Sequence, residues 1–229
     1  MKLLFIPGSG SSKEAWVYQT EYFTDSEAIA LPGHPDGEAC SSVDEYVEWL
    51  HDYIHQQGYQ DIVLIGHSLG GAIAQVYGLK YGDEVKALVL SGTGGRLRVR
   101  PDILEGLKGM IGDDAAWRKY LEDSYSSADP KFREVAMESR MKIGPAVTLN
   151  DFQCCDKFDI MDQVQNIEVP SLILCGSEDE MTPVKYASYL TNNIEGAKEV
   201  VIDGGTHSVM REKPKEYNQA IERFLAGLS

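Results

Sequence analysis

The chain has 229 residues, enough for one domain of generous size with a substantial buried core, or for a domain that carries an insertion. Its 21 basic and 36 acidic residues give a formal net charge of -15, which argues against nucleic acid as a partner. The same charge disfavours strongly anionic substrates unless a local group of basic residues compensates for it.

The apolar segments predict neither a secretory signal nor a membrane span. Residues 1–8 contain one cation and an apolar run that is too short for a signal peptide. No stretch approaches the roughly 18 apolar residues of a membrane-spanning helix. The four cysteines lack the spacing of metal ligands, and the adjacent Cys154 and Cys155 are unsuited to a disulfide. We therefore expect a cytoplasmic protein with reduced thiols, no metal and no membrane partner; the sequence specifies no oligomeric state.

Two short strands, each followed by a loop, are predicted at the start of the chain. Residues 2–6 form an apolar run that runs into a loop of small residues, 7–12. Residues 27–31 are a second strand candidate, and the turn-rich cluster 32–37 follows them. His34 in that cluster is expected to be structural, packed or hydrogen-bonded beneath the site.

A capping box predicts the next helix. Ser42 and Glu45 have the spacing in which a hydroxyl and a carboxylate satisfy the first N–H groups of a helix. Apolar residues then recur at helical spacing as far as Gly58, so one side of this helix is expected to pack on the sheet.

The most informative stretch of the sequence is residues 61–81. A β-branched apolar run, 62–65, leads into G-x-S-x-G, and small and apolar residues at helical spacing follow it. A strand, a sharp turn and a helix are predicted, with Ser68 at the tip of a turn too tight for side chains at its glycines. The N–H of Leu69 then lies at a helix N-terminus, where negative charge is favoured. Ser68 is therefore a candidate nucleophile.

The alternation of strands and helices is interrupted after the strand predicted at 87–90. From Arg96 to about Gln165 the pattern is that of amphipathic helices, over a length greater than one crossover connection needs. The helices are predicted at 101–110, 115–124, 130–142 and 147–155.

Two further strands precede the remaining chemical groups. A strand at 169–175 is followed by a loop with three acidic residues, Glu178, Asp179 and Glu180. A last strand at 199–202 leads into a glycine-rich turn that contains His207. The order serine, acid, histidine along the chain is the order found on one hydrolase fold.

These motifs resemble those of the α/β-hydrolase fold superfamily, and the resemblance extends over nearly the whole chain but weakens in its middle third. It implies a mostly parallel, reduced sheet of about six strands flanked by helices, because the first two strands of the usual fold are missing. Residues 1–95 and 166–229 would form the hydrolase core, and 96–165 a helical cap over the site.

The resemblance also implies roles for individual residues. Ser68 matches the nucleophile and His207 the catalytic base. The loop G-x-x-D-x-x-x-P matches at Asp179, which makes Asp179 the triad acid, with Glu180 as the second choice and Glu178 also chemically suitable. The backbone N–H groups of Ser9 and Leu69 would bind the oxyanion.

The predicted function is hydrolysis of short to medium acyl esters through an acyl-enzyme, without metal or cofactor. The same machinery serves carbon–carbon bond hydrolases, lactonases, thioesterases and the synthase of menaquinone biosynthesis, and a non-catalytic receptor for a small ligand is a second class of function. In the cap, Met110, Met141 and Phe152 are candidates for lining the substrate pocket. Three arginines near the cap entrance are candidates for binding a substrate carboxylate, or form a solvated basic turn: Arg96, Arg98 and Arg100.

Overall fold

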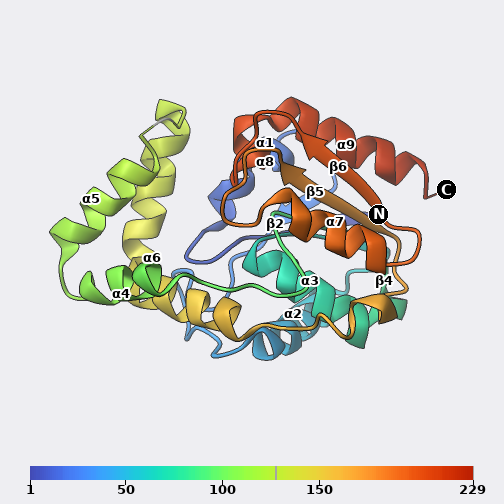
Figure 1. Ribbon diagram of the computed structural model, residues 1–229, viewed down its shortest axis with the longest axis horizontal. Coiled ribbons are helices and arrows are strands. Elements are labelled where there is room, and N and C mark those ends of the chain that lie inside the picture. Colours follow the sequence, from blue (N-terminus) through green and yellow to red (C-terminus); the bar gives the residue numbers. More distant parts are fainter. Residues whose placement is uncertain (127, 229) are drawn as a thin grey trace.

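The computed structural model describes residues 1–126 and 128–228, without the side chain of residue 131. Within these residues, a six-stranded parallel sheet has the order β2-β1-β3-β4-β5-β6 (Figure 1). The strands are β1 (Lys2–Ile6), β2 (Ser26–Ala28), β3 (Ile62–His67), β4 (Val85–Ser91), β5 (Ser171–Gly176) and β6 (Lys198–Ile202). The predicted α/β fold with a reduced parallel sheet is confirmed.

Helices cover both faces of the sheet and bury its side chains. Outside the long insertion they are η1 (Lys13–Trp16), α1 (Val17–Thr20), α2 (Val43–Gln57), α3 (Leu69–Lys80), η2 (Gly82–Glu84), η3 (Val164–Asn166), α7 (Val184–Asn193), α8 (Val209–Glu212) and α9 (Pro214–Ala226). Within the described residues, no helix is long and apolar enough to span a membrane.

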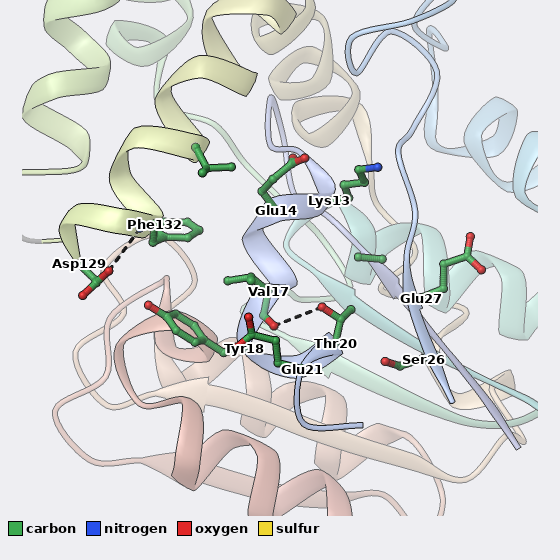
Figure 2. A pocket seen from close by; sticks show the side chains of 12 residues that line it. Lys13, Glu14, Val17, Tyr18, Thr20, Glu21, Ser26, Glu27, Asp129 and Phe132 are labelled. Carbon is green, nitrogen blue, oxygen red and sulfur yellow. Dashed lines mark hydrogen bonds between the residues drawn. The ribbon is translucent and has the colours of Figure 1, made fainter. Parts of the chain in front are cut away.

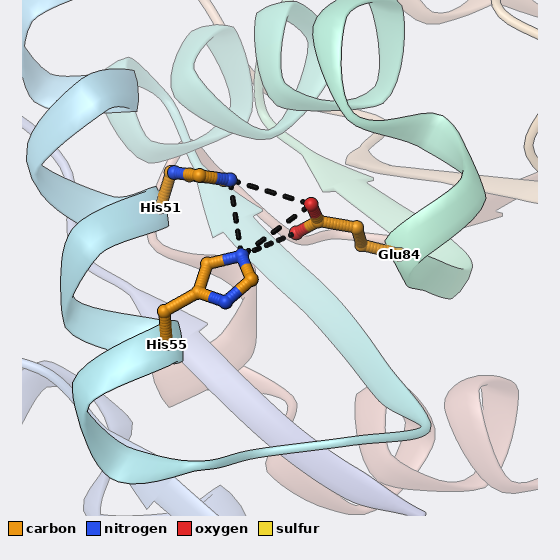
Figure 3. Close-up of side chains that lie close together, drawn as sticks. All are labelled: His51, His55 and Glu84. Carbon is orange, nitrogen blue, oxygen red and sulfur yellow. Dashed lines mark hydrogen bonds and ion pairs between the residues drawn. The ribbon is translucent and has the colours of Figure 1, made fainter.

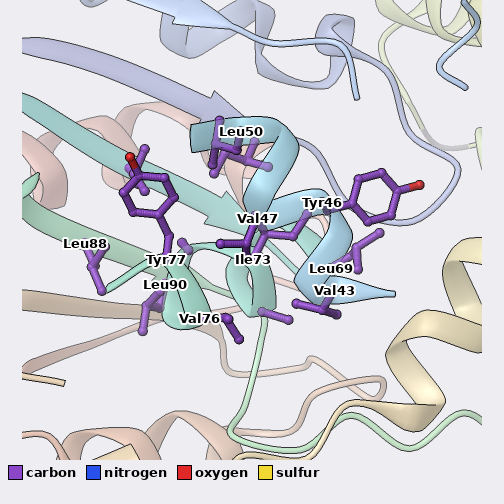
Figure 4. Packing of buried hydrophobic residues seen from close by; sticks show 14 of the residues in the cluster. Val43, Tyr46, Val47, Leu50, Leu69, Ile73, Val76, Tyr77, Leu88 and Leu90 are labelled. Carbon is purple, nitrogen blue, oxygen red and sulfur yellow. The ribbon is translucent and has the colours of Figure 1, made fainter. Parts of the chain in front are cut away.

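Successive residues of the central strands belong to different hydrophobic clusters. Leu64 and Leu88 share one cluster with α2, α3 and α7, and Figure 4 shows α2 and α3 packed together in it. Val63 and Val89 share the other cluster with η1, α8 and α9. Parallel strands buried on both faces have continuous apolar sequences, which is why short apolar runs predicted them.

The α2 helix begins and ends at the residues that its capping signals indicate. The Ser42 hydroxyl accepts a hydrogen bond of 3.2 Å from the Glu45 N–H. Gly58 ends the helix with φ 66°, a left-handed conformation that glycine adopts at little cost. The apolar side of α2 is fully or nearly fully buried, at about 1.5–3 kcal/mol of stabilisation per large aliphatic side chain. The helix is thus a firm support beneath β3 and α3.

A helical insertion separates β4 from β5, as predicted. It contains α4 (Pro101–Gly109), α5 (Asp114–Ser124) and α6 (Pro130–Lys157), which extend from one side of the molecule in Figure 1. The insertion has a hydrophobic cluster of its own: Leu107, Trp117, Leu121, Tyr125, Phe132, Ala136 and Leu149. The boundaries 96 and 165 stay a prediction.

The α6 helix is broken in the middle and connects the insertion to the sheet. Gly144 has φ 80° and ψ 168°, a conformation open essentially to glycine alone, and Pro145 follows it without an N–H to donate. Before the break, Phe132 packs in the cluster of the insertion. After it, Cys154 and Cys155 pack in the cluster of the sheet. The break therefore lets one helix serve both parts.

Candidate active site

Ser68 lies in a strained turn between β3, which ends at His67, and α3, which begins at Leu69. Its φ of 54° and ψ of -114° are unusual for a residue with a side chain, at a cost of about 1–3 kcal/mol. Two hydrogen bonds hold the turn: the Ser68 N–H donates to the Ser91 carbonyl at 2.9 Å, and the Thr93 hydroxyl donates to the Ser68 carbonyl at 3.0 Å. The predicted sharp elbow is present.

Glycines around the elbow allow backbone segments to approach more closely than side chains would permit. A Cβ at Gly66 would lie 2.1 Å from the Gly70 carbonyl oxygen, and one at Gly70 would lie 2.3 Å from the Ile6 carbonyl oxygen. A Cβ at Gly8 would lie 3.2 Å from the Ser68 Cβ. The loop after β1 therefore lies directly against Ser68.

Asp179 and His207 meet at the ends of β5 and β6. The His207 Nδ1 lies 2.8 Å from the Asp179 Oδ2. Asp179 is 4% exposed, and its other carboxylate oxygen accepts hydrogen bonds from the N–H groups of Met181 and Thr182. Burial raises the pKa of the Asp179 carboxyl, but hydrogen bonds from His207 and Thr182 outweigh burial and leave this pKa below its ordinary value. The carboxylate is thus ionised at neutral pH.

The geometry distinguishes Asp179 from the two neighbouring glutamates. It also adds Thr182, which the sequence did not indicate, to the site. Glu178 and Glu180 are both exposed. The Thr182 hydroxyl donates to the Asp179 Oδ2 at 2.7 Å and lies 3.2 Å from the His207 Nδ1. Its position just before the proline of the loop is a weak signal, since a threonine there has many ordinary roles.

A second histidine, His67, packs against His207 and forms a hydrogen bond with its backbone. The His67 ring is centred 4.7 Å from the His207 ring, and its Nε2–H donates to the His207 carbonyl at 2.8 Å. Burial and the nearby His207 lower the pKa of His67 to about 3, so this ring is neutral. His67 occupies a variable position of the G-x-S-x-G motif, and the sequence gives no sign of its contact.

One cavity of about 210 Å³ brings these segments together. Ser68 and His207 both line it, although 139 positions separate them in the sequence (207 − 68). The remaining lining comes from the loop after β1, the end of β3, the insertion, the loop after β5 and the segments around α8: Gly8, Ser9, Ser11, His67, Tyr120, Ser124, Tyr125, Arg140, Phe152, Met181, Ser208, Met210 and Arg211.

The two predicted oxyanion donors are available for a ligand. Ser9 lines the cavity, and Leu69 is the first residue of α3, next to Ser68. Among the described residues, the N–H groups of Ser9 and Leu69 donate no hydrogen bond. An N–H at a helix N-terminus also carries part of the positive end of the helix dipole. The oxyanion role of both residues stays a prediction.

A buried carboxylate fixes the loop that carries Ser9. Asp151 of α6 is completely buried and accepts hydrogen bonds from the Gly10 N–H at 2.7 Å and the Tyr46 hydroxyl at 2.8 Å. Its Oδ2 also lies 2.8 Å from His34 Nε2. Burial lowers the pKa of His34, but the Asp151 carboxylate outweighs burial and raises this pKa overall. His34 is thus hydrogen-bonded within the core, as expected.

The predicted substrate-binding residues lie in different places. Phe152 lines the cavity that contains Ser68. Met110 and Met141 pack against the hydrophobic cluster of the insertion and are not among the residues that line this cavity. Arg140 and Arg211 also line this cavity, and no pattern in the sequence indicated them. A role in substrate binding for the three predicted residues stays a prediction.

The three arginines near the predicted cap entrance have acidic partners. Arg96 and Arg98 lie 3.7 and 3.2 Å from the Asp159 carboxylate, and Arg100 lies 2.6 Å from that of Asp102. These arginines are not among the residues that line the cavity with Ser68. The structure therefore favours a solvated basic turn over a carboxylate site at this place.

A larger cavity, of about 530 Å³, lies between α1, β2 and the beginning of α6. Figure 2 shows Val17 and Tyr18 of α1 facing Phe132 of α6 across it. None of Ser68, Asp179 and His207 lines this cavity. We therefore place the candidate active site in the smaller cavity, where the reactive groups converge.

Comparison with known proteins agrees with the fold. Residues 3–220 match the model of the alpha/beta hydrolase family. The chain belongs to this family, and it is a hydrolase.

Individual relatives are hydrolases of several kinds. A solved structure described as a thermophilic esterase is 36% identical, with a TM-score of 0.82 over 100% of this chain and 90% of that one. The (E)-2-((N-methylformamido)methylene)succinate hydrolase of Acinetobacter baylyi is 25% identical over 97% of this chain and 89% of its own length. The pimeloyl-[acyl-carrier protein] methyl ester esterase of Neisseria meningitidis is 23% identical over 88% of this chain and 83% of its own.

Proposed function

We propose that the protein is a serine carboxylesterase that cleaves short to medium acyl esters of small molecules, with Ser68, His207 and Asp179 as its triad. The observation that supports this most strongly is the 2.8 Å contact between Asp179 and His207 beside a cavity that Ser68 also lines. A serine hydroxyl is a weak nucleophile until a base and oxyanion donors surround it, and this cavity offers both.

The Asp179 carboxylate determines which nitrogen of His207 carries the proton. Because the carboxylate can only accept, the hydrogen bond requires a proton on Nδ1 and leaves Nε2 free as the base. Nε2 removes the Ser68 proton as Oγ attacks the ester carbonyl carbon. Asp179 then stabilises the imidazolium ion, and it stays ionised throughout.

The tetrahedral intermediate needs donors for its negative oxygen. The N–H groups of Ser9 and Leu69 fill this role in the proposal, and the loss of one such donor typically lowers kcat by about 100- to 1000-fold. The imidazolium ion protonates the leaving alcohol, and the acyl group remains on Ser68. Water, activated by His207, then attacks the acyl-enzyme and releases the acid.

Substitution of Ser68 tests the proposal. We expect Ser68→Ala to lower kcat on p-nitrophenyl acetate and butyrate by about 10⁴- to 10⁶-fold, as for a triad that acts as a unit. Ser124→Ala is the matched control, because Ser124 lines the same cavity from the insertion. Retention of turnover by Ser68→Ala would remove Ser68 from its role.

Other reactions use the same groups and remain alternative proposals. Cleavage of carbon–carbon bonds, lactones or thioesters, and the menaquinone-pathway synthase reaction, all start from a base beside an activated serine. The names of the relatives, a hydrolase of a substituted methylenesuccinate and a methyl ester esterase, span more than one class of substrate. Turnover of neutral and carboxylated esters, compared with that of lactones and thioesters, separates them.

A receptor that binds a small ligand without turnover is the second class of function. The hydrogen-bonded Asp179 and the strained Ser68 turn argue against it, because a binding pocket needs neither. A burst of p-nitrophenol equal to the enzyme concentration would exclude a pure receptor.

A further inference from the structure

Two cationic side chains line the cavity that contains the proposed nucleophile. Arg140 comes from α6 of the insertion and Arg211 from α8, and both line the cavity with Ser68 and His207. In a chain of net charge -15, a pair of guanidinium groups beside the reacting groups is a local reversal of charge. Because both arginines line the cavity in which a substrate would bind, we ask which substrate group they could bind.

Aromatic rings fix both guanidinium groups in place. The Arg140 Cζ lies 5.3 Å from the ring centre of Trp117 and 6.0 Å from that of Tyr125. The Arg211 Cζ lies 5.4 Å from Tyr125 and 5.1 Å from Phe132. Tyr125 is thus shared by the two arginines, and their positive charges, opposing the effect of burial, lower the pKa of its hydroxyl. The arginines are held as a pair before any ligand arrives.

The arginine pair lacks an acidic partner of its own within the described part of the chain. Neither arginine forms an ion pair there, and the Nε of each is buried without a hydrogen-bond partner. The Arg211 head group donates a hydrogen bond to the Ser208 hydroxyl, and the Tyr125 hydroxyl interacts with both arginines. A partly buried cation that keeps an unused donor is costly unless something pairs with it.

Acidic groups do lie near Arg211, but on its other side. Asp129 and Glu212 border a neighbouring cavity with Arg211, and neither lines the cavity that contains Ser68. The Glu212 carboxylate accepts hydrogen bonds from the Thr206 N–H and hydroxyl, and Asp129 accepts one from the Phe132 N–H. Neither acidic group is therefore among the residues that line the cavity in which the arginine pair and Ser68 meet.

We propose that Arg140 and Arg211 bind a carboxylate of the substrate, so that the preferred substrate is an ester of a short dicarboxylic acid whose second carboxyl group is free. The proposal rests on the proposed esterase function and names its substrate class. A guanidinium group matches the planar, two-oxygen geometry of a carboxylate. A cavity of about 210 Å³ is smaller than the roughly 300–1,000 Å³ of typical ligand pockets, which suits a compact acid.

Matched substrates test this inference. Monomethyl glutarate and methyl pentanoate have the same number of acyl carbons and differ in a terminal carboxylate against a methyl group. Acid release by the native enzyme, measured by titration at constant pH, should give a kcat/KM at least about 10-fold higher for monomethyl glutarate. A charge-assisted hydrogen bond of about 1.5–3 kcal/mol corresponds to roughly 10- to 150-fold, so Arg140→Met or Arg211→Met should lower this ratio by about that factor.

The controls separate failure of this inference from failure of the esterase proposal. Arg96→Met should leave the ratio unchanged, because Arg96 pairs with Asp159 outside the cavity. If the native enzyme hydrolyses methyl pentanoate through Ser68 but shows no preference for monomethyl glutarate, the carboxylate site is wrong and the esterase stands. If neither ester is hydrolysed by the native enzyme, the esterase proposal fails first.

A measurement on the native enzyme covers the case in which an arginine variant does not fold. Glutarate should inhibit hydrolysis of p-nitrophenyl acetate competitively, and glutaramide, its neutral counterpart, should inhibit at least about 10-fold more weakly. The inhibition by glutarate should weaken as salt is added, because the contact is ionic. Equal inhibition by glutarate and glutaramide would overturn the inference.

A separate cluster of possible metal ligands lies between α2 and η2: His51, His55 and Glu84. It supports a second inference. His51 and His55 lie one turn apart on α2, and Figure 3 shows both rings directed at the Glu84 carboxylate at the end of η2. The two Nε2 atoms lie 3.0 Å apart, and they lie 3.3 and 3.4 Å from the Glu84 oxygens. In a tetrahedral zinc site with ligands at about 2.05 Å, neighbouring ligand atoms are about 3.3 Å apart. The three atoms thus outline one face of such a tetrahedron.

The surroundings hold these side chains in position. The His51 ring stacks on Tyr81, with centroids 4.0 Å apart, and its Nδ1 lies 3.9 Å from the Asp52 carboxylate. The Tyr77 hydroxyl donates to the Glu84 Oε2 at 2.8 Å. A hydrogen bond to a ligating carboxylate, such as the one from Tyr77 to Glu84, orients that carboxylate for a metal ion.

We infer that His51, His55 and Glu84 bind a divalent transition ion such as zinc, with the fourth position open to water, and so clip the end of α2 to the segment before β4. Zinc titrated into metal-free protein, followed by calorimetry, should reveal one site that His55→Ala abolishes and Cys40→Ser retains. Zinc should raise the thermal midpoint of the native protein and leave that of His55→Ala unchanged. Equal zinc binding by His55→Ala would overturn the inference.

Discussion

The carboxyl edge of the sheet and the helical insertion hold their residues in different ways. At the edge, Ser68 lies in a strained turn where an added Cβ at Gly70 would collide with the backbone of β1. In the insertion, an added Cβ at Gly106 or Gly109 of α4 would meet no atom within 4 Å. Backbone contacts thus fix the turn that carries Ser68, whereas α4 of the insertion has room for larger side chains. The arginines that would select the substrate, Arg140 and Arg211, are held by aromatic side chains instead of by the backbone.

The largest expected effect is at the edge and concerns the triad acid. In Asp179→Asn the amide can hold His207 in the wrong tautomer, so we expect kcat on p-nitrophenyl acetate to fall by about 10⁴-fold. Glu178→Gln and Glu180→Gln are the matched controls, since both glutamates are exposed, and each should stay within about twofold of the native enzyme. A large loss in either control, with little in Asp179→Asn, would move the acid to a neighbour.

The next effect concerns the carboxylate that connects the insertion to the edge. Removal of one partner of a buried ion pair costs about 3–5 kcal/mol, so Asp151→Asn should lower the free energy of unfolding by that amount in urea. The raised pKa of His34 stabilises the fold fully below the ordinary pKa of about 6.5, and this stabilisation is lost as the pH rises through the raised value. The deficit of the variant should therefore be larger at pH 5.5 than at pH 8.5.

Asp162→Asn is the control for this measurement, because Asp162 is exposed. It should change the free energy of unfolding by less than about 0.5 kcal/mol. A deficit of Asp151→Asn that does not depend on pH would contradict the role given to His34.

A pair of glycine substitutions compares the two regions directly. Gly70→Ala should displace the loop that carries Ser9 and lower kcat by about 100- to 1000-fold, because a Cβ there would lie 2.3 Å from the Ile6 carbonyl oxygen. Gly106→Ala should instead stabilise the protein by up to about 1 kcal/mol and preserve kcat, because alanine favours a helix over glycine. Esterase assays and thermal unfolding of both variants measure this difference. Equal values of kcat and of the thermal midpoint in the two variants would contradict it.

The smallest expected loss concerns the Thr182 hydroxyl behind the triad. Thr182→Val removes a hydrogen bond to the Asp179 carboxylate and should cost about 1.5–3 kcal/mol at pH 7, while Thr182→Ser keeps the hydroxyl and most of the stability. The lowered pKa of Asp179 contributes stability above the ordinary value of about 3.9, which is lost as the pH falls through the lowered value. The gap between Thr182→Val and the native protein should therefore close as the pH falls below about 4. An equal gap at pH 3 and pH 7 would contradict this account.

Local sequence patterns predicted the fold because each strand and each helix end is determined by residues that are close together in the sequence. The continuous apolar runs at β3 and β5 have the composition of strands buried on both faces, and the capping signals at Ser42 and Gly58 mark the ends of α2. The edge strand was less clear: residues 27–31 were predicted, and β2 is Ser26–Ala28. An edge strand pairs on one side only, so apolar residues after it, such as Ile29, can be buried outside the ladder.

The sequence predicted a residue of the candidate site only where a short local motif contains that residue. Ser68 lies within a tight turn that glycines reveal. Thr182 contacts His207, and Arg140 and Arg211 line the cavity with Ser68; contacts between such distant residues leave no periodic or local signal in a single sequence. Arg96 shows the reverse case, since its nearness to the insertion suggested a substrate role and its side chain pairs with an aspartate instead.

Covalent labelling tests the central claim most directly. A fluorophosphonate reacts with a serine only when a neighbouring base activates it, and mass spectrometry of peptides identifies the labelled residue. The account predicts stoichiometric labelling of Ser68 in the native enzyme and almost none in His207→Ala. Labelling of another residue, or equal labelling of Ser68 in both proteins, would contradict it.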